Sequence, residues 1–129
     1  MAMNNPYQMY KKVQIETANP LELVIKLYDG AIRFVNQAKK GLEEHDYQLA
    51  NNSLVRAQDI IEELNMSLNM ETGEIAANLR NIYNFISDEL VQANVHKNSK
   101  KLEDVVRLLT TLRSAWAEIQ IPKKQAVSE

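Results

Sequence analysis

The chain has 129 residues, of which 45% are hydrophobic and 25% are charged, as in one soluble globular domain. It contains no cysteine, which excludes disulfides, thiolate metal sites and cysteine nucleophiles. The net charge of -2 gives no support to nucleic-acid binding, which needs a clustered positive footprint. No apolar run approaches the roughly 20 residues that span a bilayer. We therefore expect neither a nucleic-acid partner nor membrane insertion.

Residues 1–18 are expected to form a segment separate from the rest of the chain. They lack the basic region followed by an apolar stretch that marks a signal peptide, which fits a cytoplasmic location. Tyr7, Tyr10 and Val13 recur at three-residue spacing. This spacing predicts a short helical or cap segment that docks on the remainder of the protein.

A first long helix is expected from Pro20 to about Glu44. Asn19 is a suitable N-cap residue, and proline is favoured at the first helical position. Gly30 lies inside this helix, where we expect it to permit a close helix crossing. The apolar stripe, with steps of three and four, is Leu21, Val24, Tyr28, Ala31, Val35, Ala38 and Leu42.

The apolar face of this first helix is unusually wide. Leu23, Leu27 and Phe34 lie on one side of the stripe, and Ile25 and Ile32 lie on the other. A peripheral bundle helix needs a narrower apolar face. We therefore expect the helix either to be central or to have a further cover over the flank of Leu23, Leu27 and Phe34.

Three more helices are expected after short turns. Their ranges are a cap at Asp46 followed by a helix to about Asn69, a helix from about Glu74 to Val95, and one from Asn98 or Ser99 to just before Pro122. Their stripes are Ala50, Leu54, Ala57, Ile61, Leu64 and Leu68; Ala76, Leu79, Tyr83, Ile86, Leu90 and Ala93; and Leu102, Val105, Leu109, Leu112, Trp116 and Ile119. Short loops favour antiparallel neighbours. The fold class is thus all-α: an antiparallel four-helix bundle over residues 19–121, followed by a flexible tail at 122–129.

Several large apolar residues lie outside these stripes: Val55, Met66, Phe85, Val91 and Val95. Single exposed apolar residues are ordinary in soluble proteins. Together with a detachable N-terminal segment, however, they indicate a groove or patch for a partner. Burying one such side chain stabilises a complex by roughly 1.5–3 kcal/mol, so a handful could hold an amphipathic helix.

The sequence offers no catalytic or cofactor-binding arrangement. Neither His45 nor His96 follows a glutamate by three residues, so the carboxylate-bundle metal motif is absent. A phosphotransfer bundle would need an exposed histidine in mid-helix, whereas His96 is expected at a helix end. The few glycines lack phosphate-binding spacing. We therefore expect a protein that is not an enzyme and needs neither a cofactor nor a metal.

An ordered set of short motifs runs from about residue 6 to residue 120. The motifs are Tyr7-Gln8-Met9-Tyr10, Ala18-Asn19-Pro20-Leu21-Glu22-Leu23, Leu27-Tyr28-Asp29-Gly30-Ala31, Ala57-Gln58-Asp59-Ile60-Ile61-Glu62-Glu63-Leu64, Gly73-Glu74-Ile75-Ala76, Leu90-Val91-Gln92-Ala93-Asn94 and Ala115-Trp116. In this order and spacing, the chain resembles the FliS family of flagellin-specific export chaperones. The resemblance implies a cytoplasmic chaperone that needs no nucleotide.

The resemblance also implies a partner, the C-terminal region of flagellin, which is disordered in the monomer and helical in the filament. A one-to-one complex would prevent premature polymerisation and keep flagellin competent for export. The export apparatus or other flagellar factors would be further partners. In the family, a tyrosine-containing N-terminal segment is associated with flagellin binding and can occupy part of the apolar site when the partner is absent. Here that role falls on Tyr7 and Tyr10.

The resemblance and the apolar outliers together give a candidate partner-binding set: Tyr7, Tyr10, Leu23, Leu27, Phe34, Val55, Met66, Phe85 and Val91. We expect residues 1–18 to act as a movable plug over the flank of Leu23, Leu27 and Phe34. One alternative is a self-associating structural bundle, a homo-oligomeric adapter with the tyrosines as interface anchors. A small enzyme or phosphotransfer protein is a third hypothesis, and it would depend on a metal, phosphate or nucleotide.

Overall fold

The structure is a computed structural model that describes the backbone of residues 20–128 and the side chains of residues 20–71 and 73–119. The helices are α2 (Pro20–Glu43), α3 (Tyr47–Met66), the short 3-10 helix η2 (Met70–Thr72), α4 (Glu74–His96) and α5 (Ser99–Ser128). No strand occurs between residues 20 and 128, and the all-α class is confirmed. The predicted N-terminal segment, with Tyr7 and Tyr10, and the predicted cap Asn19 lie outside the described residues.

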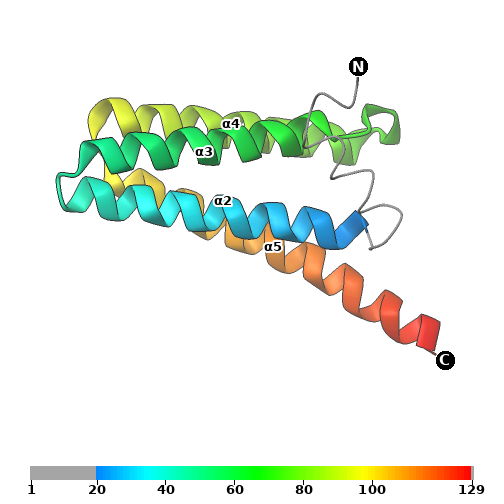
Figure 1. The fold of residues 1–129 in the computed structure, drawn as a ribbon. Helices are drawn as coiled ribbons and strands as arrows, with labels where there is room; N and C mark the ends of the chain where they lie inside the picture. The colour runs from blue at the N-terminus through cyan, green and yellow to red at the C-terminus, as the bar shows by residue number, and fades with distance from the viewer. Residues whose placement is uncertain (1–19, 129) are drawn as a thin grey trace, which may run out of the picture.

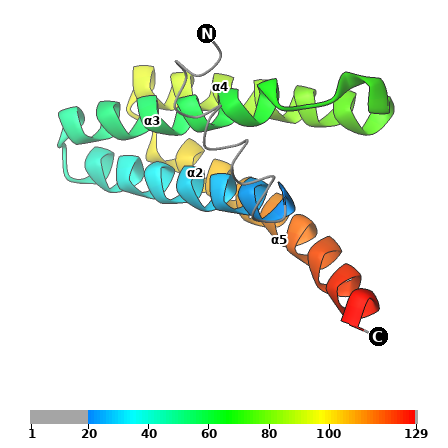
Figure 2. The ribbon, with the colours of Figure 1, turned by 45° about the vertical axis from the view of Figure 1, so that its right-hand side comes forward.

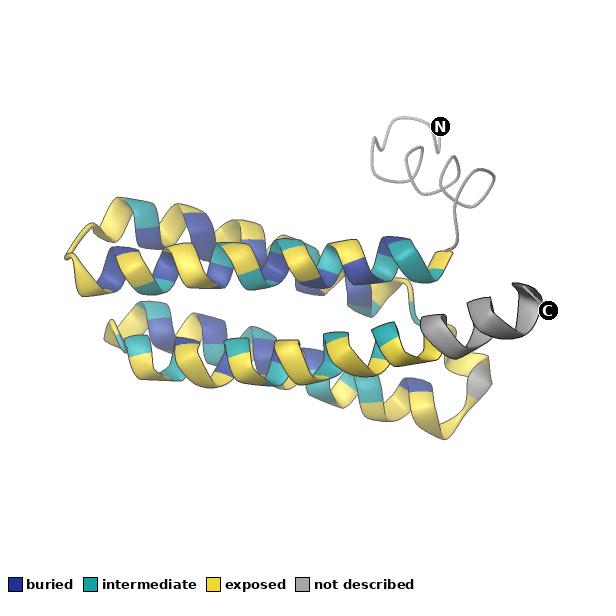
Figure 3. Ribbon diagram, turned by 90° about the horizontal axis from the view of Figure 1, so that it is seen from below, coloured by how far each residue is buried: buried dark blue, intermediate teal, exposed yellow. Residues whose placement is uncertain are grey.

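The helices form an antiparallel four-helix bundle, as predicted (Figure 1). α2 packs against α3 and α5, and α4 packs against the same two helices, so α2 and α4 stand on a diagonal. Buried positions follow the inward faces of the helices, and exposed positions follow the outward faces (Figure 3). Towards its C-terminal end, α5 diverges from the other three helices (Figures 1 and 2).

The wide apolar face of α2 is explained by its two neighbours. On the α3 side, a Cβ atom on Gly30 would lie 3.1 Å from Cδ1 of Ile60, so the side chain of Ile60, and no backbone atom of α3, packs against this glycine. On the α5 side, Nζ of Lys39 lies 3.5 Å from a carboxylate oxygen of Glu103. Leu23 and Ile25, from the two sides of the predicted stripe, are both buried, so the wide apolar face serves contacts on both sides of α2.

Two predicted helix caps are present. The side chain of Asp46 accepts a hydrogen bond of 3.1 Å from the backbone N–H of Leu49. At the start of α5, Oδ1 of Asn98 accepts hydrogen bonds from the backbone N–H groups of Lys100 and Lys101, at 3.0 and 3.3 Å. Asn98, and not Ser99, therefore satisfies the first free donors of α5.

Two helix ends differ from the prediction. α3 ends at Met66, before the predicted Asn69, because the hydroxyl of Ser67 donates a 2.9 Å hydrogen bond to the carbonyl of Leu64 and η2 follows at once. α5 continues past Pro122 to Ser128, although the sequence predicts an end before this proline. The residue before a proline is disfavoured in a helix but not excluded from one, and kinked helices are the exception.

Candidate partner-binding site

An apolar pocket lies at the end of the bundle where α2 begins and α3 joins α4. It encloses about 260 Å³ and is lined by Val24, Leu64, Ser67, Leu68, Asn69, Ile75, Ala76, Leu79, Tyr83 and Trp116. All four α-helices contribute to this lining. Leu64, Ala76 and Tyr83 are buried, whereas Ile75 is 71% exposed and stands at the rim. The C-terminal part of α5 diverges from the other helices towards this end of the bundle (Figure 2).

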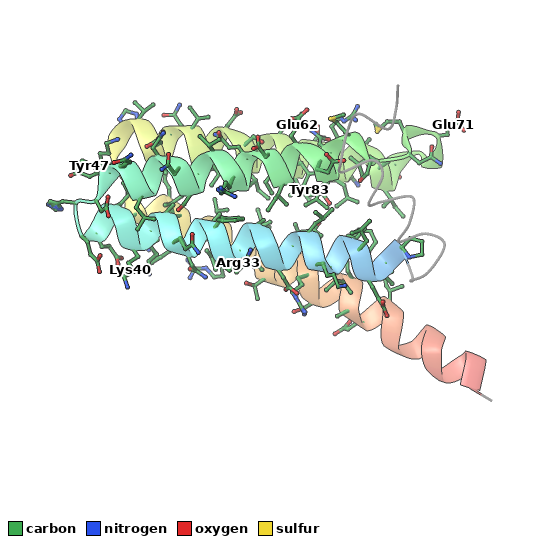
Figure 4. The ribbon with its side chains drawn as sticks, in the orientation of Figure 1. Arg33, Lys40, Tyr47, Glu62, Glu71 and Tyr83 are labelled. Carbon is green, nitrogen blue, oxygen red and sulfur yellow. The ribbon has the colours of Figure 1, made fainter. Side chains whose placement is uncertain are left out.

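The pocket has a tyrosine at its base. Tyr83 points into the interior of the bundle (Figure 4), and its hydroxyl oxygen lies 2.6 Å from that of Tyr28. Burial raises the pKa of the Tyr28 hydroxyl, while its hydrogen bonds to Tyr83 and Trp116 lower it by less. Burial, followed by the contact with Tyr28, also raises the pKa of Tyr83. Both hydroxyls are therefore neutral at physiological pH, and the pocket is lined by uncharged groups.

Four predicted outliers on α3 and α4 are exposed. Val55, Met66, Phe85 and Val91 are between 46% and 64% exposed. Nδ2 of Asn94 donates a 3.0 Å hydrogen bond to Oδ1 of Asn51, which fixes the antiparallel register of the two helices. Val55 follows Asn51 by one turn and Val91 precedes Asn94 by about one turn, so the two valines lie level with each other.

The three predicted flank residues of α2 do not form an open surface. Leu23 is only 5% exposed, and Leu27 and Phe34 are half-buried and pack against the core. The guanidinium groups of Arg33 and Arg56 lie 4.9 and 5.6 Å from the centre of the Phe34 ring. The outer edge of this flank is thus covered by arginines, in the manner of a cation–π contact.

Sequence reasoning missed the pocket as a site. It placed Leu64, Leu79, Tyr83 and Trp116 in the core stripes, and periodicity alone does not separate a core residue from one that lines a pocket. It also placed Ile119 in the stripe of the last helix, and this was wrong, because Ile119 is 54% exposed. The break at the α3–α4 connection was the available signal, since it marks where the stripes of these helices end.

A second, more open hollow of about 390 Å³ lies between α2 and α5, and its lining is mostly polar: Asn36, Lys39, Glu103, Val106, Arg107, Thr110 and Thr111. In the part of the chain whose side chains are described, no cluster of His, Asp and Glu could hold a metal ion. Within the same part, no helix combines the length and apolar character required to cross a membrane. Two ion pairs join α2 and α5: Arg113 with Asp29, and Lys39 with Glu103. The candidate site is therefore the apolar pocket at the α3–α4 end of the bundle.

Comparison with known proteins places the chain in one family. The family described as flagellar protein FliS matches residues 3–124. The flagellar secretion chaperone FliS of Bacillus subtilis (strain 168) is 37% identical over 125 residues, which cover 96% of this chain and 93% of the relative. The chaperones of the same name from Vibrio cholerae and Salmonella typhimurium are each 34% identical, over 91% and 85% of this chain and 90% and 86% of the relatives. The relatives are named as chaperones and not as enzymes, in agreement with the sequence analysis. The chain therefore belongs to the FliS family, and it is a flagellar export chaperone.

Proposed function

We propose that this protein acts in the cytoplasm, where it binds the disordered C-terminal region of flagellin, prevents premature polymerisation and keeps flagellin competent for export. The observation that carries this proposal is the apolar pocket of about 260 Å³ at the end of the bundle where α3 joins α4, in a chain of the FliS family. Helices that build a filament have apolar faces, and these faces are an assembly hazard before export. A chaperone that covers them temporarily removes the hazard.

The pocket fits an amphipathic helix that inserts apolar side chains. Its walls come from Val24, Leu68, Leu79 and Trp116, which leaves the partner few polar groups to match. Each large apolar side chain that the partner buries contributes roughly 1.5–3 kcal/mol. Ordering a disordered segment costs part of that gain, so an extended contact is needed for useful affinity.

The outer face of α3 and α4 can supply the rest of that contact. Val55 and Val91 lie level on this face, and Met66 lies at its end near the pocket, at the C-terminus of α3. Phe85 is exposed on α4. We assign these four residues to a second part of the flagellin interface. Release requires no nucleotide, because a competing site at the export apparatus would suffice.

Residues 1–18 are proposed to cover the pocket when flagellin is absent. α2 begins at Pro20, and Val24 lines the pocket one turn later, so the preceding segment is tethered beside the opening. A short tether gives an effective concentration in the millimolar range, which allows Tyr7 and Tyr10 to dock weakly and still be displaced. This placement moves the predicted plug from the flank of Leu23, Leu27 and Phe34 to the pocket.

Deletion of residues 1–18 tests the plug. The truncated chain should retain its helicity by circular dichroism and should bind an apolar dye more strongly than the full chain. A matched full-length variant, in which Tyr7 and Tyr10 are both replaced by serine, should show the same increase. Unchanged dye binding in both proteins would refute the plug.

Isothermal titration of the full chain with a peptide from the C-terminal region of flagellin tests the chaperone function. We expect saturable one-to-one binding, a negative heat-capacity change from apolar burial, and a gain of helicity. Absence of binding at tens of micromolar would reject flagellin as the partner. If the free protein were then found to dimerise with increasing concentration, the self-associating bundle would replace the proposal.

A further inference from the structure

Two arginines from neighbouring helices meet at one aromatic ring. The guanidinium carbons of Arg33 on α2 and Arg56 on α3 lie 4.9 and 5.6 Å from the centre of the Phe34 ring. Both distances fall within the roughly 6 Å of a cation–π contact. Phe34 is half-buried and packs against the core, whereas both arginines are exposed. A ring fixed by the core thus supports two cations at the surface where α2 meets α3.

These two cations have no counter-charge among the residues whose side chains are described. Asp29 lies four residues before Arg33, a spacing that allows an ion pair on a helix, but Asp29 pairs with Arg113 of α5 instead. Asp59 lies three residues after Arg56, and within the described residues neither Arg56 nor Arg33 forms an ion pair or donates a hydrogen bond. Two like charges therefore stand beside one ring.

This arrangement favours an anionic ligand. Like charges beside one ring repel each other, and an anion placed between them turns that repulsion into attraction. Each guanidinium has five N–H donors, and its fork matches the geometry of a carboxylate. Contact with the ring also restricts the arginine rotamers before a ligand arrives, so less conformational entropy is lost on binding. The group is therefore a preorganised receptor for a small oxyanion.

A carboxylate of a polypeptide fits this receptor better than the phosphates of a nucleic acid. The chain has a net charge of -2, and the exposed Asp59 lies within one turn of Arg56, so an extended polyanion would meet repulsion around the two arginines. A single acidic side chain needs only the two guanidinium groups. Neither arginine nor Phe34 lines the apolar pocket, so a ligand here leaves the pocket free.

We propose that Arg33 and Arg56, supported by the Phe34 ring, form a binding site for an acidic side chain of a protein partner, separate from the apolar pocket. Both guanidinium groups donate charge-assisted hydrogen bonds to the carboxylate. The site does not depend on the flagellin-binding function proposed above, and it can be tested with no flagellin present.

The first test titrates the full chain with tetraglutamate blocked at both ends, at low salt, and follows the arginine Nε–H signals by NMR. The signals of Arg33 and Arg56 should shift together and saturate, and high salt should weaken binding at least about fivefold. Arg107 is the internal control, because it is paired with Asp104, and its signal should stay in place. Blocked tetraglutamine should shift none of them. Equal shifts of all arginines, or none at Arg33 and Arg56, would overturn the proposal.

The second test compares variants that remove the same charge at two places. Arg56→Gln should lower the affinity for tetraglutamate at least about fivefold, while Arg107→Gln should lower it less than about twofold. Equal losses would reduce the site to general electrostatic attraction and overturn it. Phe34→Leu, with its helicity checked by circular dichroism, should also weaken binding, because the arginines lose the ring that orders them. Unchanged affinity in that variant would overturn the role of the ring.

Inorganic phosphate forms the last arm of the experiment, because it offers the same anionic oxygens without a polypeptide. It should shift the Arg33 and Arg56 signals only at higher concentration than tetraglutamate does. Tighter binding of phosphate than of tetraglutamate would refute the assignment to an acidic side chain.

Discussion

The end of the bundle that carries the α2–α3 and α4–α5 loops is closed, whereas the end that carries the α3–α4 connection is open. At the closed end, the amide of Asp46 donates a 2.7 Å hydrogen bond to the carbonyl of Gly41, and the ring of His45 stacks on that of Tyr47. Nζ of Lys97, from the other loop, lies 5.1 Å from the centre of the Tyr47 ring. The open end instead holds the apolar pocket. The spare apolar surface of this bundle is therefore concentrated where its helices separate.

At the closed end, the backbones of consecutive helices pack closely against each other. A Cβ atom on Gly41 would lie 2.8 Å from the backbone nitrogen of Ala50 and 2.9 Å from the carbonyl oxygen of Asp46. The backbone approaches here as closely as a residue without a side chain permits. At the open end, the divergence of α5 leaves Trp116 half-buried in the wall of a pocket.

The largest effect on stability is expected from a substitution in the tightly packed closed end. Gly41→Ala should lower the free energy of unfolding by about 2–3 kcal/mol, since the new methyl group meets backbone atoms that cannot move aside. Gly30→Ala is the control, because its methyl group would meet only the flexible end of Ile60 at 3.1 Å. Gly30→Ala should lower the free energy of unfolding by at most about 1 kcal/mol, because the better helix propensity of alanine offsets part of the loss. Urea unfolding measures both, and equal losses would contradict the tight packing at Gly41.

The tyrosine pair lies between the closed core and the open pocket, and it should give the next largest effect. Tyr83→Phe should cost about 2 kcal/mol, because it leaves the buried hydroxyl of Tyr28 with one partner fewer. The double change with Tyr28→Phe should cost clearly less than the sum of the single changes. A double-mutant cycle measures this coupling. Strict additivity would show that the two hydroxyls contribute independently.

A third prediction compares two exposed residues of α4. Ile75, at the pocket rim, is 71% exposed, and Val95, near the closed end, is 65% exposed. Neither Ile75→Ser nor Val95→Ser should change stability by more than about 0.5 kcal/mol. Ile75→Ser should weaken flagellin-peptide binding about tenfold through lost apolar burial, while Val95→Ser should not weaken it. If titration calorimetry showed that Val95→Ser weakens peptide binding more than Ile75→Ser does, the binding site would not be the pocket at the α3–α4 end.

The smallest effect is a pH dependence at the alkaline side. Burial raises the pKa of Tyr28 and Tyr83 above the ordinary value of 10.0, so the folded protein retains protons that the unfolded chain loses. Stability should therefore fall as the pH rises beyond about 10, and this contribution should be constant below about pH 9. The double phenylalanine variant should show a shallower fall in urea unfolding between these values. A fall as steep as that of the wild type would assign the effect to other groups.

Sequence patterns predicted the helices and the core more completely than the site. Periodicity identifies which face of a helix is apolar, and it correctly assigned Val35, Ile61 and Leu90 to the core. It contains no information on how far a neighbouring helix follows that face. Trp116 and Ile119 were therefore placed in the core, although α5 diverges there and leaves one in a pocket wall and the other exposed.

The sequence patterns also did not predict the backbone conformation of two loop residues. His45 and Lys97 have φ values of 62° and 55°, in the left-handed region where residues other than glycine are uncommon. Both residues lie in the short loops between consecutive helices, and neither is the glycine that usually marks this conformation. The cap at Asp46, in contrast, depends on its own side chain and a donor three residues away, and it was predicted.

Amide hydrogen exchange with and without the C-terminal fragment of flagellin is the most direct test of the contrast between the two ends. The account predicts slower exchange in the complex at the end of α3, through η2 and the start of α4, and in α5 around Trp116. The α2–α3 loop at the closed end should exchange at an unchanged rate. Protection confined to that loop, or no protection at the open end of a saturated complex, would contradict the assignment of the pocket as the binding site.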